Sequence, residues 1–304
     1  MLEIIKPGTK IEFMKRKGIA FIFSGIVMLA GIVSLIVHGG PLYGIDFAGG
    51  TLAQVKFSRP VETDAIRGAL KDAGLESSSI QEFEAESKGE YLIRLETTPA
   101  DLAGLSTTIK TALAKRFGEK EFEVRRIEIV GPKVGKDLRN KGIMATVLAW
   151  IAMLIYISWR FEFRFAVGGV VALAHDVIVT IGVLSITNTE FSIPILAALL
   201  TIVGYSINDT IVVYDRIREN LPKMRREPLE KVINISVNET LSRTILTSFT
   251  VFIVLLALYF LGGGVIHDFS FALIVGVVFG TYSSVFIASA LVAAWENKFP
   301  KKLR

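Results

Sequence analysis

Two acidic residues, Asp176 and Asp209, lie within long apolar runs of the 304-residue chain. A carboxyl group at the centre of a bilayer costs ~2.5–3.5 kcal/mol on insertion scales, so it is expected to face a cavity or a partner and to have a function. Burial of a carboxyl group favours its neutral form and a nearby cation favours the carboxylate, so a movable cation can load and unload a proton. The sequence therefore favours proton or ion binding at these positions.

Arg243 is the cation best placed to act on Asp209, because it begins a later apolar run from the same side and its long side chain can turn inward or snorkel outward. The spacing of Thr240, Arg243, Thr247 and Ser248 predicts one wettable helix face. We expect an ion relay made of Asp209, Arg243, Asn208, Asp176, His175 and Thr247. A purely structural contact between helices is the alternative for His175 and Asp176, and ordinary positive-inside placement is the alternative for Arg243.

Six apolar runs carry these residues. Hydrophobic residues make up 51% of the chain and the mean hydropathy is +0.52, which disfavours a soluble protein. Each run has 17–25 residues, enough for a helix to cross a bilayer. Gly276 and Gly280 predict close helix packing in the last run. The expected spans are 18–37, 142–158, 165–187, 193–214, 244–261 and 270–294. The first is too long for a signal peptide and is predicted to be a retained anchor.

Lysine and arginine alternate between the hydrophilic segments. Residues 1–17 carry five, 215–243 carry seven and 295–304 carry four, whereas the short loops 188–192 and 262–269 carry none. Because short basic segments stay in the cytoplasm, both termini are predicted to be cytoplasmic. Residues 38–141, with 16 basic and 16 acidic residues, are then periplasmic. The pI near 9.3 reflects this topology, and no nucleic-acid partner is expected.

The pattern within 38–141 predicts a small α+β domain. Alternating strand patterns at 51–57, 80–85, 91–95 and 121–130 are interrupted by helical patterns at 63–73 and 99–117. The order βαββαβ is typical of a ferredoxin-like module. Residues 131–137 lack the spacing of a phosphate loop and are predicted to be a connector. The chain has no cysteine and three scattered histidines, so we expect no metal or cofactor, only a coupling ion.

Several motifs together resemble the SecD/SecF family of protein-export subunits, over essentially the whole chain. The most specific is the run 204–220. The others are Gly44-Ile-Asp-Phe-Ala-Gly-Gly-Thr51, Val130-Gly-Pro-Lys-Val-Gly135, Ala174-His-Asp-Val177, Thr240-Leu-Ser-Arg-Thr244 with Thr247-Ser248, and Gly280-Thr-Tyr-Ser-Ser284. The glycine motif contributes Gly44, Asp46, Gly49 and Gly50 as family positions.

The resemblance implies the RND superfamily fold in the bacterial inner membrane and a SecD partner beside the SecYEG channel, with YajC as a further associate. It implies use of the proton-motive force, or of sodium in some relatives, to promote preprotein export. The family's intramembrane acid falls on Asp209 and its arginine on Arg243. An RND-type small-molecule or lipid exporter and an intramembrane aspartyl protease using Asp176 and Asp209 are the alternative functions. The exporter alternative expects a substrate cleft in the outer domain.

Overall fold

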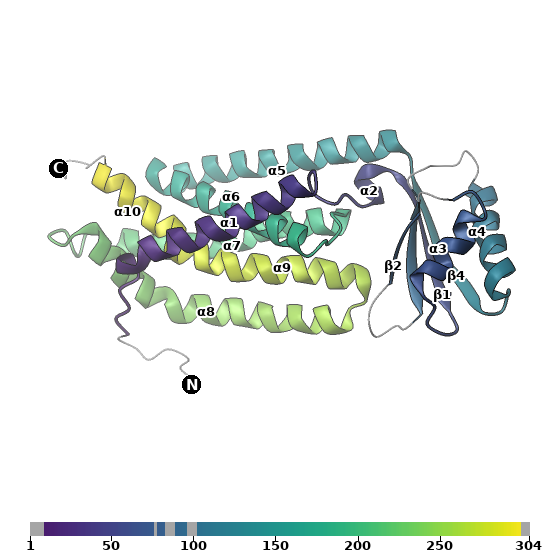
Figure 1. Cartoon of the computed structure of the whole chain (residues 1–304). Coiled ribbons are helices and arrows are strands. Elements are labelled where there is room, and N and C mark those ends of the chain that lie inside the picture. The colour runs from purple at the N-terminus through teal and green to yellow at the C-terminus, as the bar shows by residue number, and fades with distance from the viewer. Residues whose placement is uncertain (1–8, 76–77, 83–88, 96–101, 299–304) are drawn as a thin grey trace. The chain divides into compact units, whose positions relative to one another are not determined.

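A computed structural model describes residues 9–75, 78–82, 89–95 and 102–298 of the chain. The chain divides into two compact units: a helical unit of residues 1–42, 144–190 and 194–304, and an α+β unit of residues 43–143 and 191–193. Among the described residues, six helices are long and apolar enough to cross a membrane, which agrees with the predicted number of spans (Figure 1). Their bounds are α1 Lys17–Val37, α5 Pro132–Arg160, α6 Phe163–Ile186, α7 Ile193–Asn220, α8 Leu229–Leu261 and α9 Gly264–Ser283.

The sixth span does not end at Ser283. It passes through a π-helical segment, Ser284–Ala288, into α10, Ser289–Lys298. The Ser289 hydroxyl donates to the carbonyl oxygen of Ser284, 2.8 Å away and five residues back, which matches the wider π turn.

Two hydrophilic segments are largely helical. The connector predicted at 131–137 leads into the second span as part of the same helix, since α5 begins at Pro132, a residue suited to a first helical position. The hydrophilic segment 215–243 belongs mostly to α7 and α8, which leaves 221–228 between them. Arg216 forms salt bridges with Glu219 on its own helix and with Glu239 on α8. These ion pairs stabilise the parts of α7 and α8 that extend beyond their apolar segments.

The segment before α1 is held against α8 by two asparagines. The side-chain oxygen of Asn238 accepts a hydrogen bond from the backbone amide of Ile11 at 2.9 Å, and that of Asn234 accepts one from Met14 at 3.0 Å. Lys17, at the start of α1, bonds Glu230 of α8 at 2.5 Å. These polar contacts fix one end of α1 within the helical unit.

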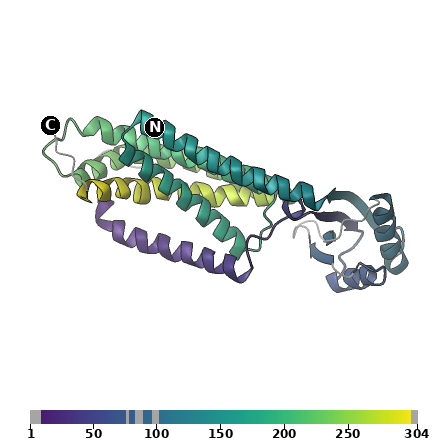
Figure 2. The ribbon, with the colours of Figure 1, turned by 90° about the horizontal axis from the view of Figure 1, so that it is seen from above.

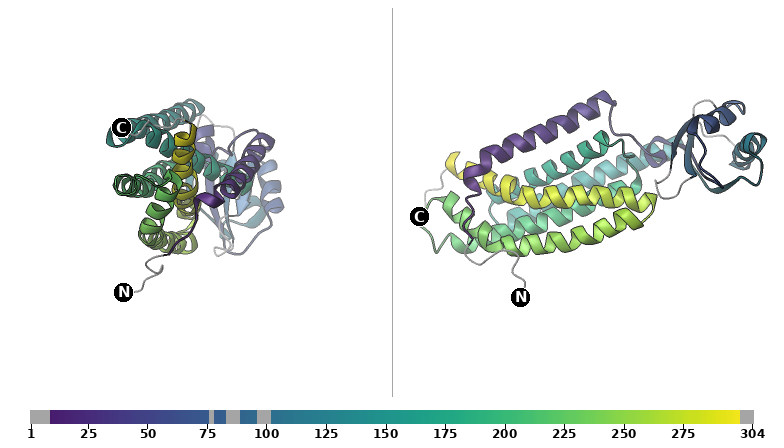
Figure 3. Two further views of the ribbon diagram at one scale, coloured as in Figure 1. Left: turned by 90° about the vertical axis from the view of Figure 1, so that its left-hand side faces the viewer. Right: turned by 60° about the horizontal axis from the view of Figure 1, so that its bottom comes forward.

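The middle of α1 packs on α6 (Figure 2). Gly31 and Gly182 face each other so closely that a Cβ on either would lie 2.7 Å from the Cα of the other. Helices in lipid approach closely only where residues are small, so this pair lets α1 and α6 touch through their backbones. α8 runs beside α9 on the other side of the unit (Figure 3).

The α+β unit contains the predicted βαββαβ order. Its elements are β1 Gly50–Phe57, α3 Thr63–Lys71, β2 Ser78–Glu82, β3 Glu90–Leu95, α4 Leu102–Phe117 and β4 Phe122–Val130. The sheet order is β2-β3-β1-β4 and every pair is antiparallel. Val55 and Phe57 of β1 pack with Ile66 of α3 and Ile109 of α4 in one core. Residues 83–85 of the second predicted strand and 99–101 of the second predicted helix lie outside the described residues.

A short helix that the sequence pattern did not indicate, α2 Ile45–Ala48, precedes β1 and leads into Gly49 and Gly50. Gly49 has a φ of +79°, and a Cβ there would lie 2.8 Å from the Cα of Pro132. Gly135 packs against the same turn, since a Cβ added to it would lie 3.0 Å from the Gly49 nitrogen. The glycines thus allow the first turns of α5 to sit directly on the start of β1.

We expect Gly49→Ala to weaken this contact by about 1–3 kcal/mol, because alanine combines an unfavourable φ with a steric clash. Hydrogen exchange of the β1 and β4 amides in the full chain measures the local opening free energy. Gly74→Ala is the matched control: its φ is +77°, but a Cβ there meets nothing within 4 Å. Equal losses in the two variants would contradict the clash.

Candidate functional site

Asp209 lies on α7 and is 3% exposed. The hydroxyl of Ser248 on α8 donates to its Oδ2 atom at a long 3.4 Å. Ser248 also lies 2.7 Å from the Thr281 hydroxyl on α9, so its hydrogen is shared between two acceptors. The carboxyl group is therefore buried among three helices with one weak side-chain partner among the described residues, which leaves it free to bind a proton or an ion.

Arg243 lies on α8 with an exposed side chain. Within the described part of the chain its guanidinium makes no hydrogen bond or salt bridge, and its charge acts on Asp209 through space. The structure therefore brings the two predicted residues into electrostatic range without an ion pair. An exposed guanidinium on a spanning helix is costly in lipid, so this face requires a polar neighbour.

The wettable face predicted on α8 is split. Thr240 and Ser248 are buried, whereas Arg243 and Thr247 are exposed. The prediction that all four share one face is wrong because they span a broad arc of the helix, and that arc straddles the edge of the packed surface. The Thr247 hydroxyl bonds the Arg243 and Thr244 carbonyl oxygens of its own helix, both at 3.0 Å.

On α7, Asn208 is exposed as well and directly precedes Asp209 in the sequence. Asn208, Arg243 and Thr247 are thus exposed polar residues on α7 and α8, the two helices that hold Asp209 and its partner Ser248. We call these three residues the α7/α8 stripe.

Asp176 on α6 is fully buried and well partnered. Its Oδ2 atom accepts hydrogen bonds from Ser206 of α7 at 2.6 Å and Ser283 of α9 at 2.8 Å. Its Oδ1 atom lies 2.9 Å from Nδ1 of His175. Asp176 and Asp209 bind different hydroxyl groups and share none, which does not favour an aspartyl protease dyad.

Two serines and a tyrosine that the sequence pattern did not single out complete the surroundings of His175. Its Nε2 atom lies 3.1 Å from the Ser24 hydroxyl of α1, which lies 3.1 Å from the Tyr282 hydroxyl of α9. The second serine is Ser283, which donates to Asp176, the hydrogen-bond partner of His175. Tyr282 and Ser283 fall in the motif 280–284, but nothing in the local sequence connects Ser24 to His175.

Gly276 and Gly280 both lie against α7. A Cβ on Gly280 would lie 3.0 Å from the Cβ of Ser206, and one on Gly276 would lie 2.2 Å from Cγ1 of Ile202. These two glycines let α9 approach α7 closely enough for Ser283 and Ser206 to bind the same carboxylate oxygen.

In the α+β unit, the glycine motif is tied to the segment before α7. The Gly44 amide donates to the Phe191 carbonyl oxygen at 2.9 Å, and the Ile193 amide donates to Oδ2 of Asp46 at 3.0 Å. Asp46 therefore has a structural hydrogen bond at the start of a spanning helix.

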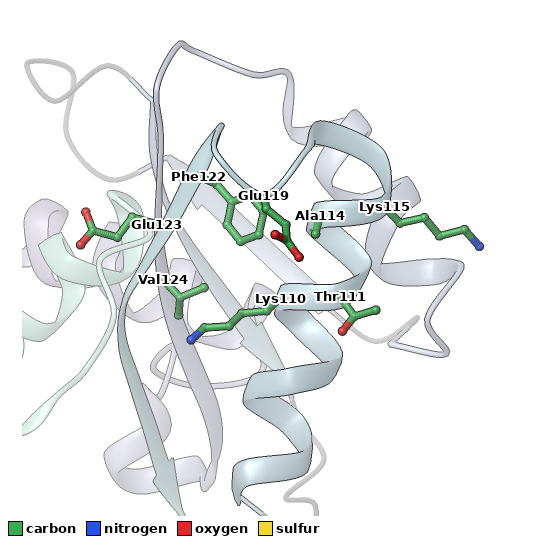
Figure 4. Close-up of a pocket in the computed structure, with 8 residues that line it drawn as sticks. All are labelled: Lys110, Thr111, Ala114, Lys115, Glu119, Phe122, Glu123 and Val124. Atoms are coloured by element: carbon green, nitrogen blue, oxygen red, sulfur yellow. The ribbon is translucent and has the colours of Figure 1, made fainter.

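A groove of about 710 Å³ lies between α4 and β4 (Figure 4). Charged side chains of both signs line it, among them Lys110, Lys115, Glu119 and Glu123, with one aromatic ring, Phe122. Small-molecule sites are mostly apolar, so this groove does not favour the exporter alternative.

Comparisons with known proteins identify the family. The model described as "Protein export membrane protein SecD/SecF, C-terminal" matches residues 109–298, and "SecD/SecF GG Motif" matches residues 35–61. The chain belongs to the SecD/SecF family. Proteins named "Protein translocase subunit SecF" are similar over nearly the whole chain. The one from Magnetococcus marinus is 47% identical, covering 99% of this chain and 97% of that protein, and the one from Escherichia coli O157:H7 is 41% identical, covering 95% and 90%.

Solved SecDF structures show the same fold. One is the structure of SecDF from Thermus thermophilus, described as a translocon-associated membrane protein. It is 38% identical with a TM-score of 0.86, and the match covers 95% of this chain and 39% of the SecDF chain. A SecDF structure in a super-membrane-facing form gives a TM-score of 0.69 at 38% identity, with 98% of this chain and 40% of that chain covered. The predicted family and multi-pass membrane fold are confirmed, and the protein is a SecD/SecF-type component of protein translocation.

We expect Gly276→Ala to destabilise the α7–α9 contact by roughly 1–3 kcal/mol through overpacking against Ile202. Adding Ile202→Ala removes the atoms that clash, so the double variant is expected to lose less than the sum of the single variants. Thermal unfolding of the full chain in detergent measures both. Gly204→Ala is the control, because a Cβ there meets nothing within 4 Å. Strict additivity would show that the glycine is not needed for this contact.

Proposed function

We propose that this SecD/SecF-family chain couples an ion gradient to preprotein export, with Asp209 as the ion-binding carboxyl and Arg243 as the cation that loads and unloads it. The observation that carries this proposal is a buried carboxyl with one long hydrogen bond, within electrostatic range of an exposed guanidinium that has no ion pair among the described residues.

One charge moving through the membrane field is worth ~2.3 kcal/mol per 100 mV. That is enough to shift a two-state equilibrium roughly fiftyfold. Approach of Arg243 favours the carboxylate and its withdrawal favours the neutral acid, so a shift of α8 relative to α7 would change the occupancy of Asp209. The coupling ion in this proposal is the proton, with sodium as the alternative.

The partner that covers the α7/α8 stripe is SecD in this proposal. SecDF chains are more than twice as long as this one, which supports a second half that packs against it. A SecD half can supply the polar groups that Asn208, Arg243 and Thr247 need and that lipid cannot. The wider assembly includes SecYEG, YajC and the preprotein.

The proposed location is the bacterial inner membrane, with both termini in the cytoplasm and residues 38–141 in the periplasm. The basic segments at 1–17, 215–243 and 295–304 support this orientation.

We expect Asp209→Asn to leave membrane insertion and SecD binding intact and to remove the ion-dependent part of export. The amide keeps the shape of the side chain but cannot carry the exchanged charge. Preprotein export into inverted membrane vesicles, measured with and without an ion gradient, gives the readout. Asp268→Asn is the control, since that carboxyl lies at the start of α9 and bonds His267. Full gradient dependence in Asp209→Asn would reject the proposal.

The SecD assignment of the stripe has its own test. The chain has no cysteine, so a single cysteine in place of Thr247 is a unique cross-linking site. We expect it to cross-link to SecD, whereas a cysteine in place of the exposed Phe249 on another part of α8 reacts with a lipid-soluble reagent. Reaction of the Thr247 position with the lipid reagent alone would show that SecD does not cover the stripe.

A further inference from the structure

A connected set of six polar contacts centres on His175 and joins four helices. Ser206 and Ser283 donate to Asp176, and His175 touches Asp176 through Nδ1 and Ser24 through Nε2. Ser24 then touches Tyr282, whose hydroxyl donates to the Ala20 carbonyl oxygen at 2.7 Å. The contacts therefore run without a break from α7 and α9 through α6 to α1.

Counting hydrogens along this set fixes the direction of each bond. A carbonyl oxygen only accepts, so Tyr282 spends its single hydroxyl hydrogen on Ala20. The contact between Ser24 and Tyr282 at 3.1 Å must then use the hydrogen of Ser24. With its own hydrogen committed, Ser24 can only accept from His175, which requires a hydrogen on Nε2.

The contact between His175 and Asp176 needs one more hydrogen. It stands either on Nδ1, giving an imidazolium beside a carboxylate, or on Oδ1, giving a neutral ring beside a neutral acid. Both arrangements place two exchangeable protons on the pair and give it no net charge. A neutral pair is also what burial favours, since Asp176 is 0% exposed and His175 is 5% exposed.

A pair with a single proton cannot make all six contacts. If the proton stands on Nδ1, then Nε2 takes the hydrogen of Ser24 and the bond between Ser24 and Tyr282 is lost. If it stands on Nε2, a bare ring nitrogen faces a carboxylate oxygen at 2.9 Å. Either way the loss of one proton breaks a contact, and the contact between Ser24 and Tyr282 is the one that can break without leaving two acceptors face to face.

We propose that His175 and Asp176 form a second proton-binding site, in which two shared protons fasten α1 to α9 through Ser24 and Tyr282. The release of one proton removes the contact between Ser24 and Tyr282 and leaves α1 held to Tyr282 by the Ala20 carbonyl oxygen alone, so the attachment of α1 to α9 is weakened. The site differs from Asp209 in every residue, so it goes beyond the proposed function and does not depend on it.

The titratable groups on the helices packed around the pair are few. α9 contributes Tyr282, and α7 contributes Tyr205 and Asp209 within one turn of Ser206. The remaining ionisable residues of α1 and α9 stand at the starts of these helices: Lys17 bonds Glu230, and His267 bonds Asp268. The pair itself therefore sets the sign of the switch: the contact between Ser24 and Tyr282 is present while the pair holds two protons and is lost when one proton leaves.

The first test reads the hydrogen on Nε2 directly. With His38→Gln and His267→Gln, selective ¹⁵N-histidine labelling of the full chain leaves the signals of His175 alone. We expect a hydrogen on Nε2 at low pH and its loss as the pH rises. An Nε2 atom without hydrogen at every pH would overturn the count of two protons. An Nε2 atom that keeps its hydrogen over the whole range would overturn the release.

The second test reads the position of α1. Cysteines in place of the exposed Ile22 on α1 and Val278 on α9 accept spin labels, and the distance between the labels is measured across the pH range. We expect the distance to change in the pH interval where Nε2 loses its hydrogen. Tyr282→Phe keeps the ring, removes the link and should abolish the pH dependence. A pH-dependent change that persists in Tyr282→Phe contradicts the proposal.

Two control backgrounds separate the alternatives. Ser34→Ala removes a hydroxyl contact of α1 with Ser185, which is separate from the His175 contacts, and should leave the pH dependence intact. Asp209→Asn should also leave it intact. If Asp209→Asn abolishes the change in distance, the switch belongs to Asp209 and the second proton-binding site is rejected, whatever the outcome of the export assay.

Discussion

The arrangement of the helical unit depends on one constraint: a polar side chain within the bilayer must find its partners in protein, because hydrocarbon offers none. Asp176 and Asp209 meet this constraint in opposite ways. Asp176 has hydrogen-bond partners on both oxygens, from its own helix, α7 and α9. Asp209 has one long contact from Ser248. The first carboxyl joins three helices through its hydrogen bonds, and the second has one of its oxygens without a side-chain partner among the described residues.

Small residues supply the geometry that makes this division possible. Gly280 brings α9 against Ser206, so hydroxyl groups from two helices reach the same oxygen of Asp176. Gly31 and Gly182 bring α1 against α6, and that approach puts Ser24 within reach of His175. Dispersion and interhelical hydrogen bonds drive association in lipid, and both need close backbones. Packing and polar chemistry are therefore one feature of this bundle, and an enlarged residue at a glycine position would disturb the hydrogen bonds as well as the fit.

Local patterns in the sequence predict the six spans, the βαββαβ order and the importance of the two intramembrane acids. They do not show which part of a helix face packs against other helices. The spacing therefore predicts one wettable face for Thr240, Arg243, Thr247 and Ser248, although two of these residues are buried and two are exposed. They also miss partners that are far apart in the chain: Ser24 meets His175 across 151 positions and Tyr282 across 258. Nor do local patterns show that the connector at 131–137 is helical from Pro132, where Gly135 packs on Gly49.

The exposure of the α7/α8 stripe indicates that this chain needs a second protein to cover it. Asp209 is buried by this chain alone, whereas Arg243 is not. The charge of Arg243 lies on the surface of a spanning helix without an ion pair in the described structure. A guanidinium in contact with lipid would snorkel away from the carboxyl that it serves. Covering the stripe with a second protein holds the cation beside Asp209 and excludes lipid from the pair. In the proposed function the partner is then part of the ion site, which gives a physical reason for the occurrence of SecDF as one longer chain.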